Sequence, residues 1–311
     1  MTRRLLAAPS AGAALPPAPL SKPVPRTGER LPVIGLGGRD FRVNQGIELA
    51  MLIARLLELG GSVIDTAAAY GAGESEQVIG QALAQLSARP WVFLATKLIG
   101  APPADVARGA GRAAPFGRAS FERSLELLRT DYLDLLQVHN LVGVDAVWPL
   151  LMELKQAQKV RYLGITTSDP ADHQALAQLM QRYPLDFIEV DYSIANRDAE
   201  HTLFPLARER KIAVMVDVPL GGAGRGGFSL GMLRDKPLPP FAAEWGVRDW
   251  PPLLLKYVIS HPAVTCAIPG TTRLEHLEDD QAAAHGVLPD AGQRRALEAY
   301  WDRLIAPGST R

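Results

Sequence analysis

The stretch Ile64-Asp65-Thr66-Ala67-Ala68-Ala69-Tyr70-Gly71 joins the end of a short apolar run to an acidic residue and a tyrosine. The residues just before Asp65, Ser62-Val63-Ile64, have the composition of a buried β-strand, so the carboxylate stands at a strand end. A carboxylate there is costly to remove from water unless a positive group pairs with it. The sequence therefore predicts a cation close to Asp65 in space.

Two further apolar runs end on ionisable side chains. The run at 91–96 leads to Lys97, and the run at 132–138 leads to His139. Three strands that end on ionisable groups, with Tyr70 just past the first, predict one site in which Lys97 pairs with Asp65. The alternative is a buried Asp65–Lys97 salt bridge with Tyr70 and His139 as ordinary rim residues.

Apolar runs alternate with amphipathic segments along most of the chain. Strands are expected at 32–38, 62–65, 91–97, 132–139, 161–167, 187–192, 212–217 and 264–268. Helices are expected at 45–59, 75–86, 119–129, around 147–154, and at 173–182, 199–210, 252–260, 274–284 and 291–304; a turn is expected at 27–29 and a long loop at 98–117. Eight strand–helix pairs favour an α/β fold of the (β/α)8 TIM barrel type in a single domain, with the site at the C-terminal strand ends.

The competing fold is an open, doubly wound parallel sheet. That fold requires a glycine-rich phosphate turn after an early strand, and Gly35-Leu36-Gly37-Gly38 does not match the required pattern.

The composition limits the classes of partner. The 33 basic residues equal the 33 acidic residues, so charge gives no reason to expect nucleic acid or an anionic membrane. Cys266 is the single cysteine, which excludes an intrachain disulfide and a zinc site built on cysteine spacing, and no metal is expected. No apolar run reaches about eighteen residues, so no membrane-spanning helix is expected. The expected partner is a small molecule; the oligomeric state stays open.

The first thirty residues differ from the rest in composition. Met1-Thr2-Arg3-Arg4-Leu5-Leu6 opens on paired arginines, as in a twin-arginine export signal, but prolines interrupt the apolar segment that follows. Residues 1–30 are therefore predicted to be a flexible tail or an export signal, and residues 31–311 the barrel. The expected location is cytoplasmic, with periplasmic export as the alternative.

Asp65, Tyr70, Lys97 and His139, in this order, resemble the catalytic tetrad of the aldo-keto reductases. The flanks agree with that family: Asp65-Thr66-Ala67 through Tyr70-Gly71, Ser75-Glu76, Ile79-Gly80-Gln81-Ala82-Leu83 and Leu94-Ala95-Thr96-Lys97. The resemblance runs from about Leu31 to Asp280.

The resemblance implies an NAD(P)H-dependent enzyme, normally using NADPH with NADH as an alternative, that reduces an aldehyde or ketone to an alcohol. Tyr70 would be the general acid, Lys97 would lower the pKa of Tyr70 while Asp65 holds the ammonium, and His139 would orient the carbonyl.

The family's cofactor positions carry over with substitutions. Thr166 and Thr167 stand where a Ser-Asn pair usually holds the carboxamide of the nicotinamide, and Glu189 replaces the usual glutamine. Asp217 stands where an aromatic ring often stacks on the nicotinamide. Because Glu189 and Asp217 depart from the pattern, a nucleotide-binding sensor or subunit with little turnover is the alternative function.

The resemblance also implies contacts with the rest of the nucleotide. The pyrophosphate would lie under Pro219, Leu220 and Gly221. The adenosine end would meet Gly270, Thr271, Thr272, Arg273, His276, Asp279 and Asp280. The carbonyl substrate itself is not predicted, because it would lie among loops such as the one at 98–117 and the glycine-rich loop after the strand expected at 212–217.

Overall fold

The computed structural model describes residues 18–100, 113–221 and 228–305. Its main sheet has eight parallel strands in sequential order. They are β3 (Leu36–Gly37), β4 (Val63–Asp65), β5 (Phe93–Leu98), β6 (Leu133–His139), β7 (Val160–Thr167), β8 (Phe187–Asp191), β9 (Ala213–Asp217) and β10 (Val264–Ala267). Parallel bridges from Ile34 to Ala267 and from Gly37 to Gly270 join the first strand region to the last. The predicted (β/α)8 barrel is confirmed.

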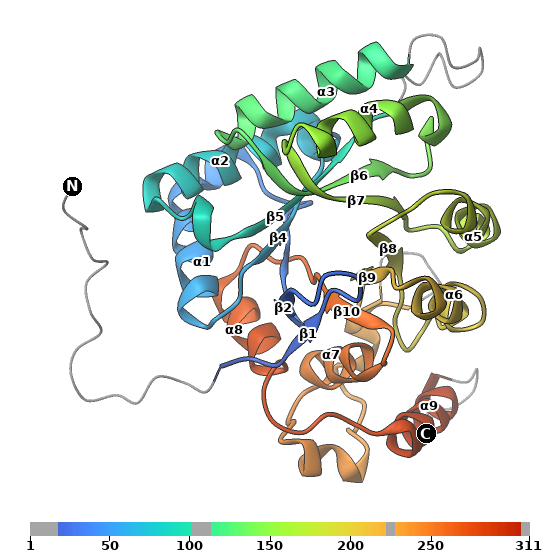
Figure 1. Cartoon of the computed structure of the whole chain (residues 1–311). Coiled ribbons are helices and arrows are strands. Elements are labelled where there is room, and N and C mark those ends of the chain that lie inside the picture. Colours follow the sequence, from blue (N-terminus) through green and yellow to red (C-terminus); the bar gives the residue numbers. More distant parts are fainter. Residues whose placement is uncertain (1–17, 101–112, 222–227, 306–311) are drawn as a thin grey trace.

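Helices surround the strands (Figure 1). They are α1 (Gly46–Glu58), α2 (Glu74–Leu86), α3 (Ala113–Leu128), α4 (Val144–Gln156), α5 (His173–Arg182), α6 (Leu203–Arg210), α7 (Trp250–Ser260) and α8 (Leu274–Ala282), followed by α9 (Ala291–Ile305). Apolar side chains from the helices and the outer faces of the strands form one large buried cluster between the two layers. None of the helices in the described part of the chain is long and apolar enough to cross a membrane.

A hairpin packs against the N-terminal ends of the barrel strands. Its strands, β1 (Ser21–Pro23) and β2 (Arg30–Pro32), are antiparallel, and Gly28 in the predicted turn has a φ of 77°. Val24 and Leu31 join the second buried cluster, which holds inward-facing strand residues such as Phe93. Residues 18–30, which the composition placed with the tail, thus form part of the barrel's packing. Residues 1–17 lie outside the described residues.

The hairpin is also tied to the last strand–helix pair. The ammonium of Lys22 donates to the backbone carbonyls of Ile259, His261 and Val264, at 2.7, 2.8 and 2.8 Å. These bonds satisfy carbonyls around the end of α7, where no helical partner is available.

Three predicted elements differ from the structure. The expected strand at 32–38 is divided, because Val33 and Gly35 exchange backbone hydrogen bonds with Ala267 whereas only 36–37 pairs with β4. The expected helix at 199–210 is a 3-10 turn, η6 (Asp198–Glu200), followed by α6. Helix α3 begins inside the expected loop at 98–117, where alanines favour a helix and a proline fits its first turn. Residues 101–112 of that loop lie outside the described residues.

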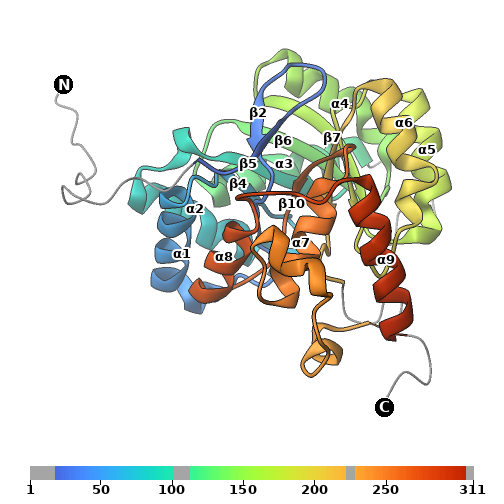
Figure 2. The ribbon, with the colours of Figure 1, turned by 90° about the horizontal axis from the view of Figure 1, so that it is seen from below.

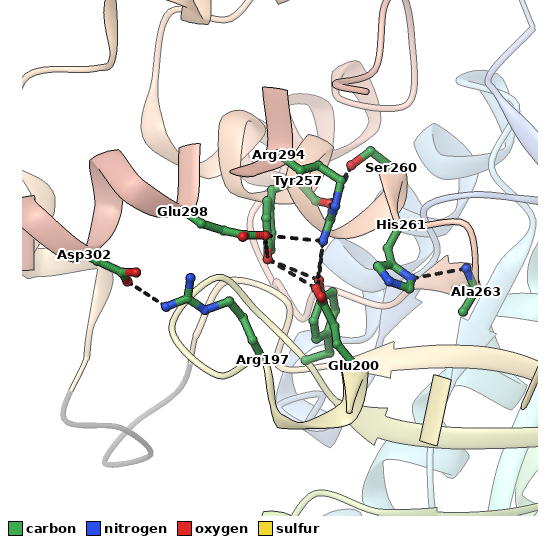
Figure 3. A network of polar contacts seen from close by, with 10 residues as sticks. Arg197, Glu200, Tyr257, Ser260, His261, Ala263, Arg294, Glu298 and Asp302 are labelled. Atoms are coloured by element: carbon green, nitrogen blue, oxygen red, sulfur yellow. Dashed lines mark hydrogen bonds and ion pairs between the residues drawn. The ribbon is translucent and has the colours of Figure 1, made fainter. Parts of the chain in front are cut away.

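Helix α9 runs along the outside of the ring, near α7 (Figure 2), and is joined to it by a buried arginine. Arg294 donates from Nη2 to Tyr192 Oη at 2.6 Å and to Glu200 Oε1 at 2.8 Å. Its Nη1 donates to Ser260 Oγ at 3.0 Å and to the carbonyl of Tyr257. The network (Figure 3) joins α9, α7 and the segment after β8.

Candidate active site

A cavity of about 720 Å³ lies at the C-terminal ends of the barrel strands. Its walls come from residues at or just after β3, β4, β6, β7, β8, β9 and β10. Predicted site residues that line it are Asp65, Tyr70, His139, Thr166, Glu189, Asp217, Pro219, Leu220, Gly221 and Gly270. The barrel thus brings together residues that are up to about two hundred positions apart in the chain.

The predicted ion pair forms beneath this cavity. Lys97, on β5, is fully buried, and its Nζ contacts Asp65 Oδ2 at the end of the neighbouring strand β4. The same Nζ donates to the carbonyl of Thr66 at 3.0 Å and lies 3.2 Å from Glu189 Oε1 on β8. Two carboxylates therefore share one ammonium, where the sequence predicted one.

Tyr70 and His139 face each other in the cavity wall. Tyr70 begins the 3-10 turn η2 (Tyr70–Gly73), in which Gly71 and Ala72 have φ angles of 59° and 54° before α2 starts. The Lys97 Nζ lies 5.2 Å from the centre of the Tyr70 ring. The His139 ring meets the Tyr70 ring edge-on, with centroids 5.8 Å apart. The four predicted catalytic residues therefore converge.

Burial sets the protonation of this pair. Burial raises the pKa of Tyr70 above its ordinary value; Lys97 opposes the rise, but Asp65 and Glu189 support it. The family resemblance predicts that Lys97 lowers the pKa of Tyr70, but in the free protein the effect of Lys97 is outweighed. The pKa of His139 is lowered to about 4 by burial, and then by Lys97 and Arg39. His139 is therefore a neutral imidazole at neutral pH.

The floor of the cavity is acidic. Glu189, 1% exposed, accepts from Gln137 Nε2 at 2.6 Å. Burial, and then Glu189, raise the pKa of Asp65 and of Asp217, although Lys97 opposes the rise for both. The Oδ1 atoms of Asp65 and Asp217 are buried without a hydrogen-bond partner. The floor thus holds three carboxylates around one ammonium and offers free acceptor atoms.

Comparison with known proteins identifies the family. The model of the aldo/keto reductase family matches residues 33–298. This chain belongs to the aldo/keto reductase family. Methylglyoxal reductase YeaE of Escherichia coli (strain K12) is 32% identical to this reductase over 276 residues, which span 87% of this chain and 91% of that protein.

Solved structures agree with the family. An aldo-keto reductase from Klebsiella pneumoniae in complex with NADPH is 29% identical, with a TM-score of 0.72 over 91% of this chain and 94% of that one. Aldo-keto reductase AKR11C1 from Bacillus halodurans, at 24% identity, has a TM-score of 0.74 over 90% of this chain and 96% of that one, which shows the fold alone.

Thr167, the second predicted carboxamide contact, does not line the reductase's cavity. Its hydroxyl donates to Asp172 Oδ2 at 2.9 Å, and the residue is buried. Successive side chains of a strand point to opposite faces, so Thr166 faces the cavity and Thr167 faces the helices.

Apart from Gly270, the residues predicted to meet the adenosine end do not line this cavity. Thr272, Arg273, His276 and Asp279 are exposed around the start of α8, and Thr271 is half-buried. The guanidinium of Arg273 pairs with Glu275 at 2.8 Å. Asp280 is buried, and burial followed by the nearby Asp279 raises its pKa to about 7. Gly270, which lines the cavity, is the point where the cavity meets this surface.

Sequence reasoning missed other cavity-lining residues. They are Gly37, Gly38, Arg39, Asp40, Arg42, Ala69, Gly71, Asn140, Ser168, Val218, Leu230, Ile268 and Pro269. Most come within a few residues of a predicted strand end, so counting the whole loop after each strand would have found them. Leu230 lies far from any strand end, and no local signal marks it.

Proposed function

We propose that this reductase uses NADPH, with NADH as a weaker alternative, to reduce a small aldehyde or ketone to an alcohol, with Tyr70 as the general acid. The observation that carries this proposal is the convergence of Tyr70, His139 and the buried Lys97–Asp65 pair in one cavity. The NADPH complex of the Klebsiella pneumoniae relative supports the cofactor. The name of the Escherichia coli relative supports a small carbonyl substrate.

The residues present fit a nicotinamide nucleotide. The cavity runs from Tyr70 and His139 to the Pro219–Gly221 segment and to Gly270, and its floor has buried oxygens without partners. Thr166 and Glu189 would hold the nicotinamide end. The segment at 219–221 would hold the pyrophosphate, and the start of α8 would hold the adenosine end, where a helix N-terminus favours an anion.

Tyr70 and His139 would hold the carbonyl oxygen by hydrogen bonds. NADPH, when bound, supplies the hydride that adds to the carbonyl carbon. As the carbon–oxygen π pair moves to oxygen, that oxygen takes the hydroxyl proton of Tyr70, and water later returns a proton to the phenolate. The Lys97 ammonium, held by Asp65, stabilises that phenolate while it exists. Proton transfer of this kind contributes roughly a hundredfold to ten-thousandfold to a rate.

The test is the Tyr70→Phe variant. It removes the proton donor and little surface, so we expect kcat to fall by about a hundredfold or more while NADPH affinity changes by less than about threefold. Lys97→Met should also reduce kcat. Tyr300→Phe, which removes an exposed hydroxyl from α9, is the matched control and should keep wild-type kinetics. Wild-type turnover in Tyr70→Phe would show that Tyr70 is not the acid.

A second candidate is a nucleotide-binding sensor or subunit with little turnover. The acidic floor formed by Glu189 and Asp217 favours it, because it departs from the usual nicotinamide site. Measuring NADPH oxidation with a panel of aldehydes and ketones separates the two. Tight NADPH binding with no turnover on any carbonyl would support the sensor.

A further inference from the structure

The negative charge on the cavity floor is only partly neutralised. Lys97 is shared between Asp65 and Glu189. Asp217 has no ion-pair partner among the described residues. Asp191, its neighbour across the β8–β9 register, lies 3.4 Å from His173 Nε2 and accepts a hydrogen bond from the Asn196 amide. Burial and Glu189 raise the pKa of Asp217, so a positive charge brought to this floor would favour the ionised form of that unpaired carboxyl group.

Hydride transfer places the nicotinamide against the same floor. The carbonyl oxygen must reach Tyr70 and His139, and the donor carbon must come within about 3.5 Å of the carbonyl carbon. Asp65, Glu189 and Asp217 line the cavity around those two residues. The Oδ1 atoms of Asp65 and Asp217 belong to this floor and have no hydrogen-bond partner. The nicotinamide ring would therefore lie close to two unpaired carboxyl oxygens.

We infer that this acidic floor, with Asp217 as its main unpaired group, selects the oxidation state of the cofactor: it strengthens binding of NADP⁺ relative to NADPH. The inference rests on the proposed function. The two forms carry the same phosphates and differ at the nicotinamide ring, which is positively charged in NADP⁺ and neutral in NADPH. Only groups near the ring can discriminate between them, and a carboxylate there favours the charged form.

The selection has a consequence for the direction of the reaction. NADPH becomes NADP⁺ by losing a hydride, which is one proton with two electrons. The carbonyl carbon gains that hydride, and the carbonyl oxygen gains the proton of Tyr70. If the floor stabilises NADP⁺ more than NADPH, the bound cofactor gives up its hydride more readily, by thermodynamic linkage. Tighter product binding would at the same time slow the release of NADP⁺.

The experiment measures the dissociation constants of NADP⁺ and NADPH by calorimetric titration, without a carbonyl substrate. Asp217→Asn and Glu189→Gln each remove one ionisable carboxyl group of the floor and keep the side-chain shape. Because burial and Glu189 raise the pKa of Asp217, the titrations are run at mildly alkaline pH. Asp131→Asn removes a charge from an exposed residue outside the cavity and is the matched control. The quantity compared is the ratio of the two dissociation constants within each variant. A general loss of nucleotide affinity changes both constants equally and leaves this ratio unchanged.

In Asp217→Asn we expect the ratio of the NADP⁺ constant to the NADPH constant to rise by at least about fivefold, as a nearby unit charge would produce. Glu189→Gln should shift it in the same direction but less, because Glu189 is already shared with Lys97. Asp131→Asn should leave the ratio unchanged. An unchanged ratio in both floor variants, with both nucleotides still bound, would overturn this inference and leave the proposed function intact. Failure of the wild type to bind either nucleotide would overturn both.

Discussion

Tyr70 can donate a proton only while its hydroxyl still holds one. Burial raises the pKa of Tyr70 above the ordinary value of about 10. Lys97 opposes this rise, whereas the carboxylates Asp65 and Glu189 add to it. A raised pKa keeps the hydroxyl protonated to higher pH, so the alkaline fall in rate should lie above about pH 10. We expect kcat/KM for carbonyl reduction to show no fall caused by Tyr70 below that pH.

Glu189→Gln tests the cause of this shift. The variant removes one of the carboxylates that raise the pKa of Tyr70, so the alkaline fall should move to lower pH than in the wild type. The measurement is kcat/KM against pH at saturating NADPH, with Asp131→Asn, an exposed residue outside the cavity, as the control for a general change in charge. A wild-type rate that falls well below pH 10, or a Glu189→Gln profile displaced upward, would contradict the role given to these carboxylates.

The residues most open to prediction were those at strand ends. The positions of Asp65, Lys97 and His139 in the site followed from the three apolar runs that precede them. The contact between Lys97 and Glu189 did not follow, because it joins β5 to β8 and depends on the curvature of the closed sheet. The net direction of the Tyr70 pKa was missed because burial is its largest cause, and burial follows from the closed barrel rather than from the neighbouring residues in the sequence.

Helix α2 contains Gly80, a glycine in one of the stretches that resemble the family, and this glycine allows α2 to pack closely against α3. Gly80 lies where α2 meets the end of α3, and a Cβ there would stand 2.1 Å from the carbonyl oxygen of Leu127. Gly80→Ala would gain about 1 kcal/mol in helix propensity, but the backbone of α3 would have to move. We expect a net loss of roughly 1–3 kcal/mol in the free energy of unfolding.

The control for Gly80→Ala is Gly46→Ala at the start of α1. A Cβ on Gly46 meets nothing within 4 Å, so this substitution should be neutral or slightly stabilising. Urea unfolding followed by circular dichroism measures both. Equal stabilities for the two variants would mean that the α2–α3 contact accommodates a methyl group without cost.

Periodicity predicted these elements unevenly. Most helices have strong apolar stripes and were located to within a few residues. The divided strand around Gly35 was missed, because its hydrogen bonds go to β10 at the other end of the barrel. The start of α3 was missed, because an Ala-rich, Pro-containing segment is compatible with both a loop and a first helical turn.

At the scale of the whole molecule, the count of eight strand–helix pairs predicted the barrel, but not what surrounds it. Lys22 of the hairpin at 21–32 contacts carbonyls more than two hundred residues away, and Arg294 of α9 contacts Tyr192, 102 residues away. Lys22 and Arg294 look like ordinary surface cations in the sequence. Their partners are mostly backbone carbonyls and hydroxyls, which carry no sequence signal of pairing.

Arg294 is expected to hold α9 on the barrel. Its guanidinium is 6% exposed and serves Tyr192, Glu200, Ser260 and the Tyr257 carbonyl (Figure 3). Arg294→Met would leave the Glu200 carboxylate and buried hydroxyls without this donor. Removing one partner of a fully buried pair costs about 3–5 kcal/mol. Because Glu200 is partly exposed, we expect a loss of about 2–3 kcal/mol in the free energy of unfolding.

Arg197→Met provides the comparison for this prediction. Arg197 also joins the segment after β8 to α9, through Asp302 at 2.6 Å, but both side chains are substantially exposed. Exposed pairs contribute at most about 1 kcal/mol, so this variant should unfold close to the wild type. Neither residue lines the catalytic cavity, so both variants should keep wild-type kcat at temperatures where they are folded. Urea unfolding and carbonyl reduction measured on the same samples test both statements. Equal losses of stability in the two variants would mean that burial of the Arg294 network adds nothing to the attachment of α9.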